Sequence, residues 1–362
     1  MSLAVLLSRS LIGLDAPTVR VEVHLARGLP SFGIVGLADA EVRESRERVR
    51  AALQSSGYDF PLGRLTVNLS PADLPKESGR FDLPIAIGVL LVSGQVSILE
   101  RTQDEATLKR SPLLANLVLA GELSLTGALV STKGALAIAL SVARSSPAAT
   151  LVLPMEDAIE AARFPGLVVL GARTLAEVVG HLDGSNPLVF SEPAPLVEQA
   201  SNQGCLSELR GQLLARRALE LAAAGGHSML LSGSPGVGKS MLAKRMPGIL
   251  PALSHAESLE VASIAAFAGL SRPLSSARPF RAPHHSASVA AIIGGGLKPK
   301  PGEVSLAHRG VLFMDELPEF DRRVREALRE PLENYEIALA RANLKVVYPA
   351  DFQLLATMNP CP

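Results

Sequence analysis

The run Gly233-Ser-Pro-Gly-Val-Gly-Lys-Ser240 decides the expected fold of the second half of the chain, because it matches G-x-x-x-x-G-K-[ST] without departure. The apolar run 228–232 precedes it and the helix-forming run 241–245 follows, which is the strand–loop–helix context that the motif requires. Main-chain N–H groups of such a loop surround phosphate oxygens, and its glycines keep Cβ atoms out of the way. The sequence therefore predicts a triphosphate site formed by Gly233, Ser234, Pro235, Gly236, Val237, Gly238, Lys239 and Ser240.

Two of these residues carry chemistry that ATP and Mg²⁺ require. Lys239 would place a positive charge between the β- and γ-phosphates, and the Ser240 hydroxyl would ligate Mg²⁺. Further along, Gly310-Val-Leu-Phe-Met-Asp315-Glu316 reads as a buried strand with two carboxylates at its carboxyl end, which is the edge where parallel sheets bind ligands. We expect Asp315 to hold Mg²⁺ and Glu316 to orient or deprotonate the attacking water.

A third apolar run, Phe352-Gln-Leu-Leu-Ala-Thr-Met-Asn359, reads as another buried strand that ends in an amide. Asn359 is expected to bridge the attacking water and the γ-phosphate. An asparagine before a proline is also a common turn residue, so this role depends on the two preceding motifs.

Outward from these motifs, the composition divides the chain into two domains. Residues 183–205 have no period of 2 or 3.6 and contain several prolines, which is typical of a linker between domains 1–182 and 206–362. In the second domain, 206–224 reads as one long amphipathic helix ahead of the phosphate loop. In the first, strands at 18–25 and 65–69 flank a helix at 39–56 capped by Asp39, so an α/β fold with mixed strands is expected.

Arginines and glutamates crowd the polar face of that expected helix at 39–56. One interpretation is a solvated face with Glu44–Arg48 pairing, and the other is a phosphate-binding face.

Bulk composition excludes several classes of protein. Of the 362 residues 48% are hydrophobic and 19% charged, so a folded core is expected rather than disorder. Lys+Arg 35 balance Asp+Glu 35, which excludes a globally basic nucleic-acid coat but not a local patch. The longest apolar run, 83–92, is too short for the roughly 20 residues of a membrane helix, and the opening segment lacks the marks of a signal peptide. With two distant cysteines and no disulfide framework, a cytoplasmic protein without membrane contact is expected.

Two segments between the nucleotide motifs are candidate contacts to a polymer. Residues 336–348 alternate as a hairpin with its turn at 342–343, and Arg341 and Lys345 flank that turn. The Gly/Pro/Lys run 294–302 supplies Lys298 and Lys300, which could meet phosphates. An ordinary surface hairpin and a plain solvated loop are the alternatives. The adjacent His284 and His285 lack further ligands at metal-binding spacing.

Longer strings identify a family resemblance. The segments 36–53, 67–77, 278–285, 305–320 and 358–362 resemble the ComM/YifB proteins, which are AAA+ ATPases related to the magnesium-chelatase ATPase subunit. The resemblance spans residue 3 to the end. It implies a P-loop AAA+ core with a parallel sheet, and a hexameric ring that uses ATP and Mg²⁺ to move on single-stranded or branched DNA. The family is associated with branch migration during natural transformation.

The resemblance also implies that domain 1–182 is similar to the proteolytic domain of Lon. The stretches that correspond to that domain's nucleophile and base, 79–82 and 133–136, supply neither a serine nor a suitably placed lysine, so no peptidase activity is expected. The family continues past Asn359 through a Cys-rich segment, an arginine finger and a helical lid. The sequence is therefore expected to be a fragment or a truncated product, and Cys361 would be the first residue of that Cys-rich segment.

Three functions follow from these observations. The first is a DNA-remodelling motor. The second is a chelatase-type ATPase that drives metal insertion into a porphyrin, against which the amino-terminal domain argues. The third is a chain that binds ATP without turning it over, because an arginine finger contributes about 10³–10⁵ to the rate in related phosphoryl transfers.

Overall fold

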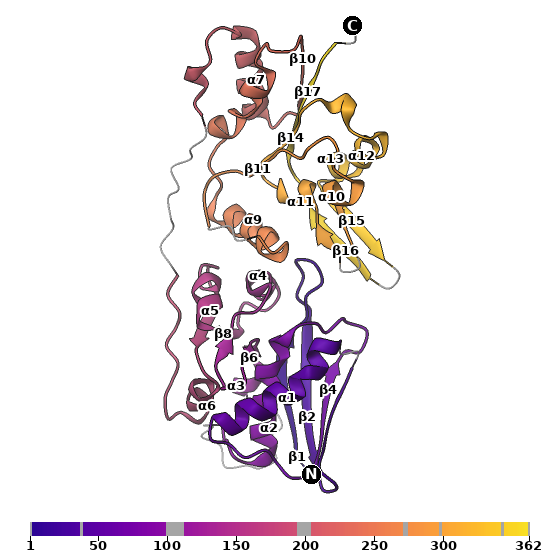
Figure 1. Ribbon diagram of the computed structural model, residues 1–362. Coiled ribbons are helices and arrows are strands. Elements are labelled where there is room, and N and C mark those ends of the chain that lie inside the picture. Colours follow the sequence, from indigo (N-terminus) through magenta and orange to yellow (C-terminus); the bar gives the residue numbers. More distant parts are fainter. Residues whose placement is uncertain are drawn as a thin grey trace. The chain divides into compact units, whose positions relative to one another are not determined.

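The computed structural model describes residues 2–36, 39–98, 112–193, 204–270, 274–296, 299–341 and 344–360 (Figure 1). The chain separates into two units, residues 1–195 and 196–362, and the division falls inside the segment predicted as a linker. Among the described helices, none has both the length and the apolar character that crossing a bilayer requires.

The first unit contains a mixed seven-stranded sheet with the order β3-β4-β2-β1-β5-β8-β9. The pairs β1–β2 and β2–β4 are antiparallel and the other four pairs are parallel, as expected for an α/β unit with mixed strands. Its strands are β1 (Ser2–Arg9), β2 (Thr18–Ala26), β3 (Ser31–Val35), β4 (Arg64–Ser70), β5 (Leu117–Leu119), β8 (Thr150–Pro154) and β9 (Val168–Ala172). A small hairpin adds β6 (Glu122–Leu123) and β7 (Leu129–Val130). The helices are α1 (Ala40–Ser55), η1 (Gly79–Phe81), α2 (Asp82–Ser93), α3 (Pro112–Ala115), α4 (Ala135–Ser145), α5 (Met155–Ala161) and α6 (Leu175–Asp183).

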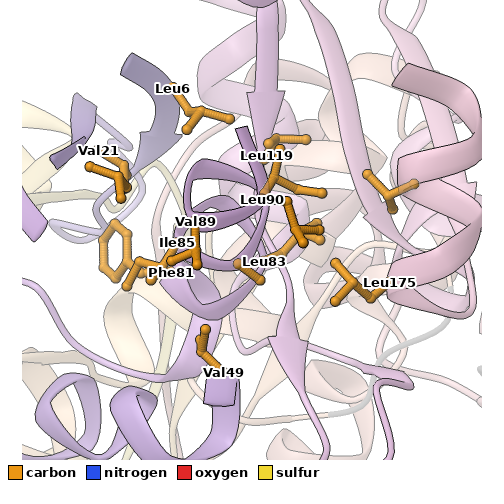
Figure 2. Close-up of a cluster of buried hydrophobic side chains, with 14 of the residues drawn as sticks. Leu6, Val21, Val49, Phe81, Leu83, Ile85, Val89, Leu90, Leu119 and Leu175 are labelled. Atoms are coloured by element: carbon orange, nitrogen blue, oxygen red, sulfur yellow. The ribbon is translucent and has the colours of Figure 1, made fainter. Parts of the chain in front are cut away.

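The core of the first unit forms where α2 lies against the sheet. Helix α2 is almost entirely apolar and buried, so the run that is too short to span a membrane is a core helix. Figure 2 shows Leu83, Ile85 and Val89 gathered with Leu6 of β1 and Val21 of β2. Gly88 permits this close approach, because a Cβ there would lie 2.4 Å from a methyl carbon of Val23.

The polar side of α1 differs from the solvated face that local pattern suggests. The helix begins after Asp39, whose carboxylate accepts a hydrogen bond from the Val42 N–H, as the sequence predicts. Arg48, however, makes two hydrogen bonds, of 2.6 and 3.2 Å, to the fully buried Asp82 carboxylate at the start of α2. Glu44 is its more distant partner, at 3.9 Å. The bond to Asp82 raises the pKa of Arg48, whereas burial raises the pKa of Asp82. The two hydrogen bonds tie α1 to α2.

Replacing Arg48 by alanine is expected to destabilise the first unit by about 3–5 kcal/mol, because Asp82 would remain buried without its cation. The measurement is hydrogen exchange of the β2 and α2 amides, which reports on this unit separately. Arg43→Ala is the matched control, since Arg43 is exposed on the same helix; its effect should stay within about 0.5 kcal/mol. Equal protection in the two variants would contradict a structural role for the pair.

The chain after α6 stays with the first unit for several residues. The Ser191 N–H donates to the Val169 carbonyl at 2.9 Å, and Phe190 forms a bridge with Leu170. The stretch predicted as a linker from residue 183 therefore begins as an addition beside β9.

The single long helix predicted over 206–224 is wrong. A short η3 (Leu206–Glu208) is separated from α7 (Leu213–Gly225) by a turn. Gly211 and Gln212 occupy the left-handed region at φ 75° and 54°, which a continuous helix cannot accommodate. Periodicity did not reveal the break, because the apolar spacing continues through it.

The second unit contains a four-stranded parallel sheet with the order β10-β17-β14-β11 (Figure 1). Its strands are β10 (Met229–Ser232), β11 (Phe280–Arg281), β14 (Val311–Met314) and β17 (Gln353–Met358). The helices are α8 (Lys239–Ala243), η4 (Met246–Ile249), α9 (His255–Phe267), α10 (Val289–Ile293), α11 (Glu303–Leu306), η5 (Leu317–Glu319), α12 (Arg322–Ala327) and α13 (Arg329–Asn334). The strands predicted around both nucleotide motifs and before Asn359 are confirmed, and they are neighbours.

Two hairpins project from this unit and pack against each other. They are β12 (Gly294–Gly295) with β13 (Lys300–Pro301), and β15 (Glu336–Arg341) with β16 (Leu344–Pro349), the hairpin predicted at 336–348. The buried Tyr348 joins them, because its hydroxyl donates to the Pro299 carbonyl at 2.8 Å. Its ring lies 5.9 Å from that of Phe267 at the end of α9.

Candidate functional site

The phosphate loop connects β10 to α8 through two left-handed glycines. Gly236 and Gly238 have φ values of 81° and 88°, which residues with a Cβ adopt only with strain. Residues 234–238, which include Ser234, Pro235 and Val237, are exposed, whereas Lys239 and Ser240 are half-buried at the base of the loop. The loop main chain is therefore accessible to a ligand.

Lys239 joins the loop to the end of β17. Its Nζ donates to the Gly233 carbonyl at 2.6 Å, to the Ser234 carbonyl at 2.9 Å and to Asn359 Oδ1 at 2.8 Å. The bond to Asn359 joins residues 120 positions apart in the sequence. This contact places Asn359 beside the phosphate loop.

Ser240 joins the loop to the end of β14. Its hydroxyl lies 3.0 and 2.9 Å from the two carboxylate oxygens of Asp315. A hydroxyl and a carboxylate are the hard oxygen ligands that Mg²⁺ prefers. Among the described residues no group of three or more His, Cys, Asp or Glu side chains could hold a metal, including around His284 and His285. A cation at this site would therefore rely on Ser240, Asp315 and the ligand's own oxygens.

Thr357, which lies outside the predicted nucleotide-binding residues, holds the acidic pair in place. Its buried hydroxyl donates to Asp315 Oδ1 and accepts the Glu316 N–H at 2.9 Å. Glu316 itself adopts the left-handed region at φ 56° and is exposed. The signal was available, because Thr357 lies in β17 two residues before Asn359, and residues two apart in extended backbone point to the same side.

A cavity of about 220 Å³ lies beside the phosphate loop. One wall is the turn before α7, which positions Gln212 so that its Nε2 donates to the Val237 carbonyl at 3.2 Å. Arg245 holds the segment before this turn in place. Its guanidinium donates hydrogen bonds to the Glu208 carboxylate at 2.7 Å and to the Cys205 carbonyl at 3.1 Å. Arg210 and Ser232 add polar groups to the lining. Its apolar residues are Leu209, Ala215, Leu231, Val237, Met241 and Leu242. Gln212 and Leu209 were missed because they lie in the segment predicted as helix.

The candidate polymer contacts lie on the two hairpins. Lys300 is exposed in β13, Lys345 is exposed in β16, and Arg341 ends β15 opposite Leu344. Lys298 and Cys361 lie outside the described residues. The packing through Tyr348 places the hairpins next to each other, although they are about 35 residues apart in the chain.

Comparisons with known proteins match both units. A family described as magnesium chelatase, subunit ChlI, matches residues 205–362, and one described as subunit ChlI of Mg-chelatase matches residues 21–157. The chain is 45% identical over 364 residues to the uncharacterised protein YifB of Escherichia coli, covering all of this chain and 69% of that protein. It is 44% identical over 367 residues to YifB of Salmonella typhimurium, and 45% identical over 370 residues to the competence protein ComM of Haemophilus influenzae, with the same coverage.

Proposed function

The chain belongs to the YifB/ComM family of magnesium-chelatase-like AAA+ proteins, and from this we propose that it is an ATP-hydrolysing motor that acts on DNA. The observation that carries the ATPase proposal is the convergence of Lys239, Ser240, Asp315 and Asn359 from the phosphate loop, β14 and β17. Loop, acid and amide meet at one sheet edge, where a triphosphate bound to the loop would find all of them.

Each residue has a defined role toward the triphosphate. The loop N–H groups bind phosphate oxygens, and Lys239 exchanges its carbonyl partners for the β- and γ-phosphates. The exposed Glu316 accepts a proton from the attacking water, and Asn359 orients that water toward the γ-phosphate. Ser240 and Asp315 would hold Mg²⁺, which when bound would offset the negative charge on the phosphates.

The cavity beside the loop suits the base of the nucleotide. Its leucine, valine and methionine walls provide apolar surface for a planar ring, and Gln212 supplies a polar group at its rim. The turn at 211–212 places this wall next to Val237. The proposed ligand is therefore ATP, with its base between the turn and the loop.

The DNA part of the proposal is supported by the relative named a competence protein and by the basic hairpins. Lys300 and Lys345 are exposed on the two packed hairpins that project from the second unit. Arg341 ends β15, in the same hairpin as Lys345. We propose that six copies assemble into a ring and that these hairpins contact single-stranded or branched DNA.

A second candidate is a chelatase-type ATPase that drives metal insertion. Both family descriptions name magnesium chelatase, including the one that matches residues 21–157, so the amino-terminal unit does not by itself separate the two functions. The chemistry of ATP hydrolysis is shared, and the macromolecular or porphyrin partner distinguishes them.

The test measures ATP turnover and strand movement with one preparation of the full-length protein. A DNA motor should hydrolyse ATP faster when forked DNA is present and should displace a labelled strand only with ATP. The Glu316→Gln variant serves as the inactive control. An ATP turnover rate that stays the same when DNA is added, together with no strand displacement, would reject the DNA motor. Turnover stimulated only by porphyrin and partner subunits would favour the chelatase.

Thr357→Val is expected to lower kcat by about 10- to 100-fold and to raise the Mg²⁺ concentration needed for half-maximal rate, because the hydroxyl orients a metal ligand. Thr357→Ser keeps the hydroxyl and should remain close to wild type. ATP binding without Mg²⁺ should be unchanged in both variants. Valine and serine variants with the same Mg²⁺ dependence would contradict this positioning role.

A further inference from the structure

We propose that a pocket on the first unit, between α1 and the edge strand β3, binds one nucleotide of single-stranded nucleic acid. The pocket has a volume of about 240 Å³. It lies outside the ATP site and is built from different residues. The inference rests on the proposed function, because it identifies where the first unit would contact the DNA on which the motor acts.

The pocket has an aromatic wall. Phe32 of β3 and Phe60, which follows α1, line it with ring centroids 5.6 Å apart and an angle of 38° between the rings. Both rings are half-buried, and the neighbouring Leu62 is 92% exposed. Partly exposed aromatic rings next to exposed apolar surface are suited to stacking against a flat ligand.

Two guanidinium groups complete the pocket. Arg50 lies over the Phe60 ring, 4.9 Å from its centroid, and Arg46 donates through Nη1 to the Phe32 carbonyl at 3.3 Å. Both are exposed, and neither forms an ion pair with any described residue. Arg48, on the same helix, instead forms an ion pair with the buried Asp82. Glu47 is the acidic lining residue, so the lining charge is net positive and complements a phosphate.

The position of β3 leaves the pocket accessible. Among the described strands, β3 is the first of the sheet order and pairs only with β4, and its side chains alternate between exposed and half-buried. A chain can therefore approach along this edge without displacing a neighbouring strand.

A nucleotide is the occupant that uses all of these features. Its base offers a ring to stack on Phe60 beside Arg50, and its phosphate is an anion within reach of Arg46 and Arg50. An acidic peptide would satisfy the arginines but not the aromatic wall. Since every base has a π face, the site should accept any sequence.

The test is fluorescence anisotropy of a labelled oligothymidylate with the full chain, at several salt concentrations. Arg46→Gln/Arg50→Gln should weaken binding about 10-fold or more and should lower the salt slope by about 0.7, because both arginines face the same phosphate. Phe60→Leu should weaken binding about 5-fold or more, and Phe60→Tyr should restore it because it keeps the ring. Arg43→Gln removes one positive charge from the same helix outside the pocket and should bind like wild type.

The outcomes separate this inference from the proposed function. If wild type binds the oligonucleotide but the pocket variants match Arg43→Gln, the pocket is not the site, while the DNA motor stands. If only the Lys300→Gln/Lys345→Gln variant lost oligonucleotide binding, the hairpins would be the binding site, and this would also overturn the inference. If polyglutamate displaced the oligonucleotide and the Phe60→Leu variant bound it like wild type, the pocket would be a site for an acidic peptide. A wild-type chain that binds no single strand contradicts this inference, and the assay with forked DNA then decides the DNA motor separately. Hydrogen exchange of β4 checks that each variant is folded.

Discussion

Replacement of Lys239 by alanine is expected to weaken ATP binding by about 10²- to 10³-fold. In the structure the ammonium group is half-buried between two loop carbonyls and Asn359, so it is positioned for phosphate oxygens before any ligand arrives. This loss of affinity is about 2.8–4.2 kcal/mol, which lies within the roughly 2–5 kcal/mol that removing one member of such a charge-assisted pair costs. Titration of a fluorescent ATP analogue measures the dissociation constant directly.

Lys244→Ala is the matched control for this variant. Lys244 follows α8, five residues further along, and is exposed, so its removal changes the net charge equally. It should bind the analogue like wild type. Similar affinities of the Lys239 and Lys244 variants would remove the phosphate-binding role of Lys239, and with it the nucleotide site.

Replacement of Glu316 by glutamine is expected to lower kcat by about 10²- to 10⁴-fold while ATP binding remains close to that of wild type. Its side chain is exposed, and its backbone is anchored through Thr357, so glutamine should occupy the same place without a basic oxygen. Phosphate release under single-turnover conditions measures the chemical step, and analogue titration measures binding.

Glu319→Gln provides the comparison, because Glu319 is an exposed acid three residues later in η5. It should turn ATP over normally. A Glu316→Gln protein that hydrolyses ATP at the wild-type rate would show that another group accepts the proton. A variant that loses binding as well would show that Glu316 supports the site structurally.

Local sequence pattern predicted the elements whose causes are local. Alternation of apolar residues predicted β2 and β4, the Asp39 cap predicted the start of α1, and alternating residues on both sides of 342–343 predicted β15 and β16. Each of these depends on neighbours within a few positions. The break at 211–212 was missed because apolar periodicity says nothing about the backbone angles of Gln212.

Local sequence pattern did not predict the partners of the polar groups in the first unit. Arg48 has Glu44 four residues away, and a helix viewed alone favours that pair. In the structure Arg48 instead pairs with Asp82, 34 positions later, because α1 and α2 pack together. The buried carboxylate of Asp82 requires a cation. Phe32, Arg50 and Phe60 likewise form one pocket only after β3, α1 and the following loop are assembled.

By itself the sequence determined that a phosphate loop lies between a strand and a helix, that acids end one apolar strand, and that an amide ends another. These are properties of short segments, and parallel strands then expose their carboxyl ends at one edge. Only the tertiary structure decided which side chains complete the site: Thr357 beneath the acids, Gln212 beside the loop, and Asn359 on Lys239. Contacts between distant residues depend on strand order, turn geometry and packing, which no local pattern encodes.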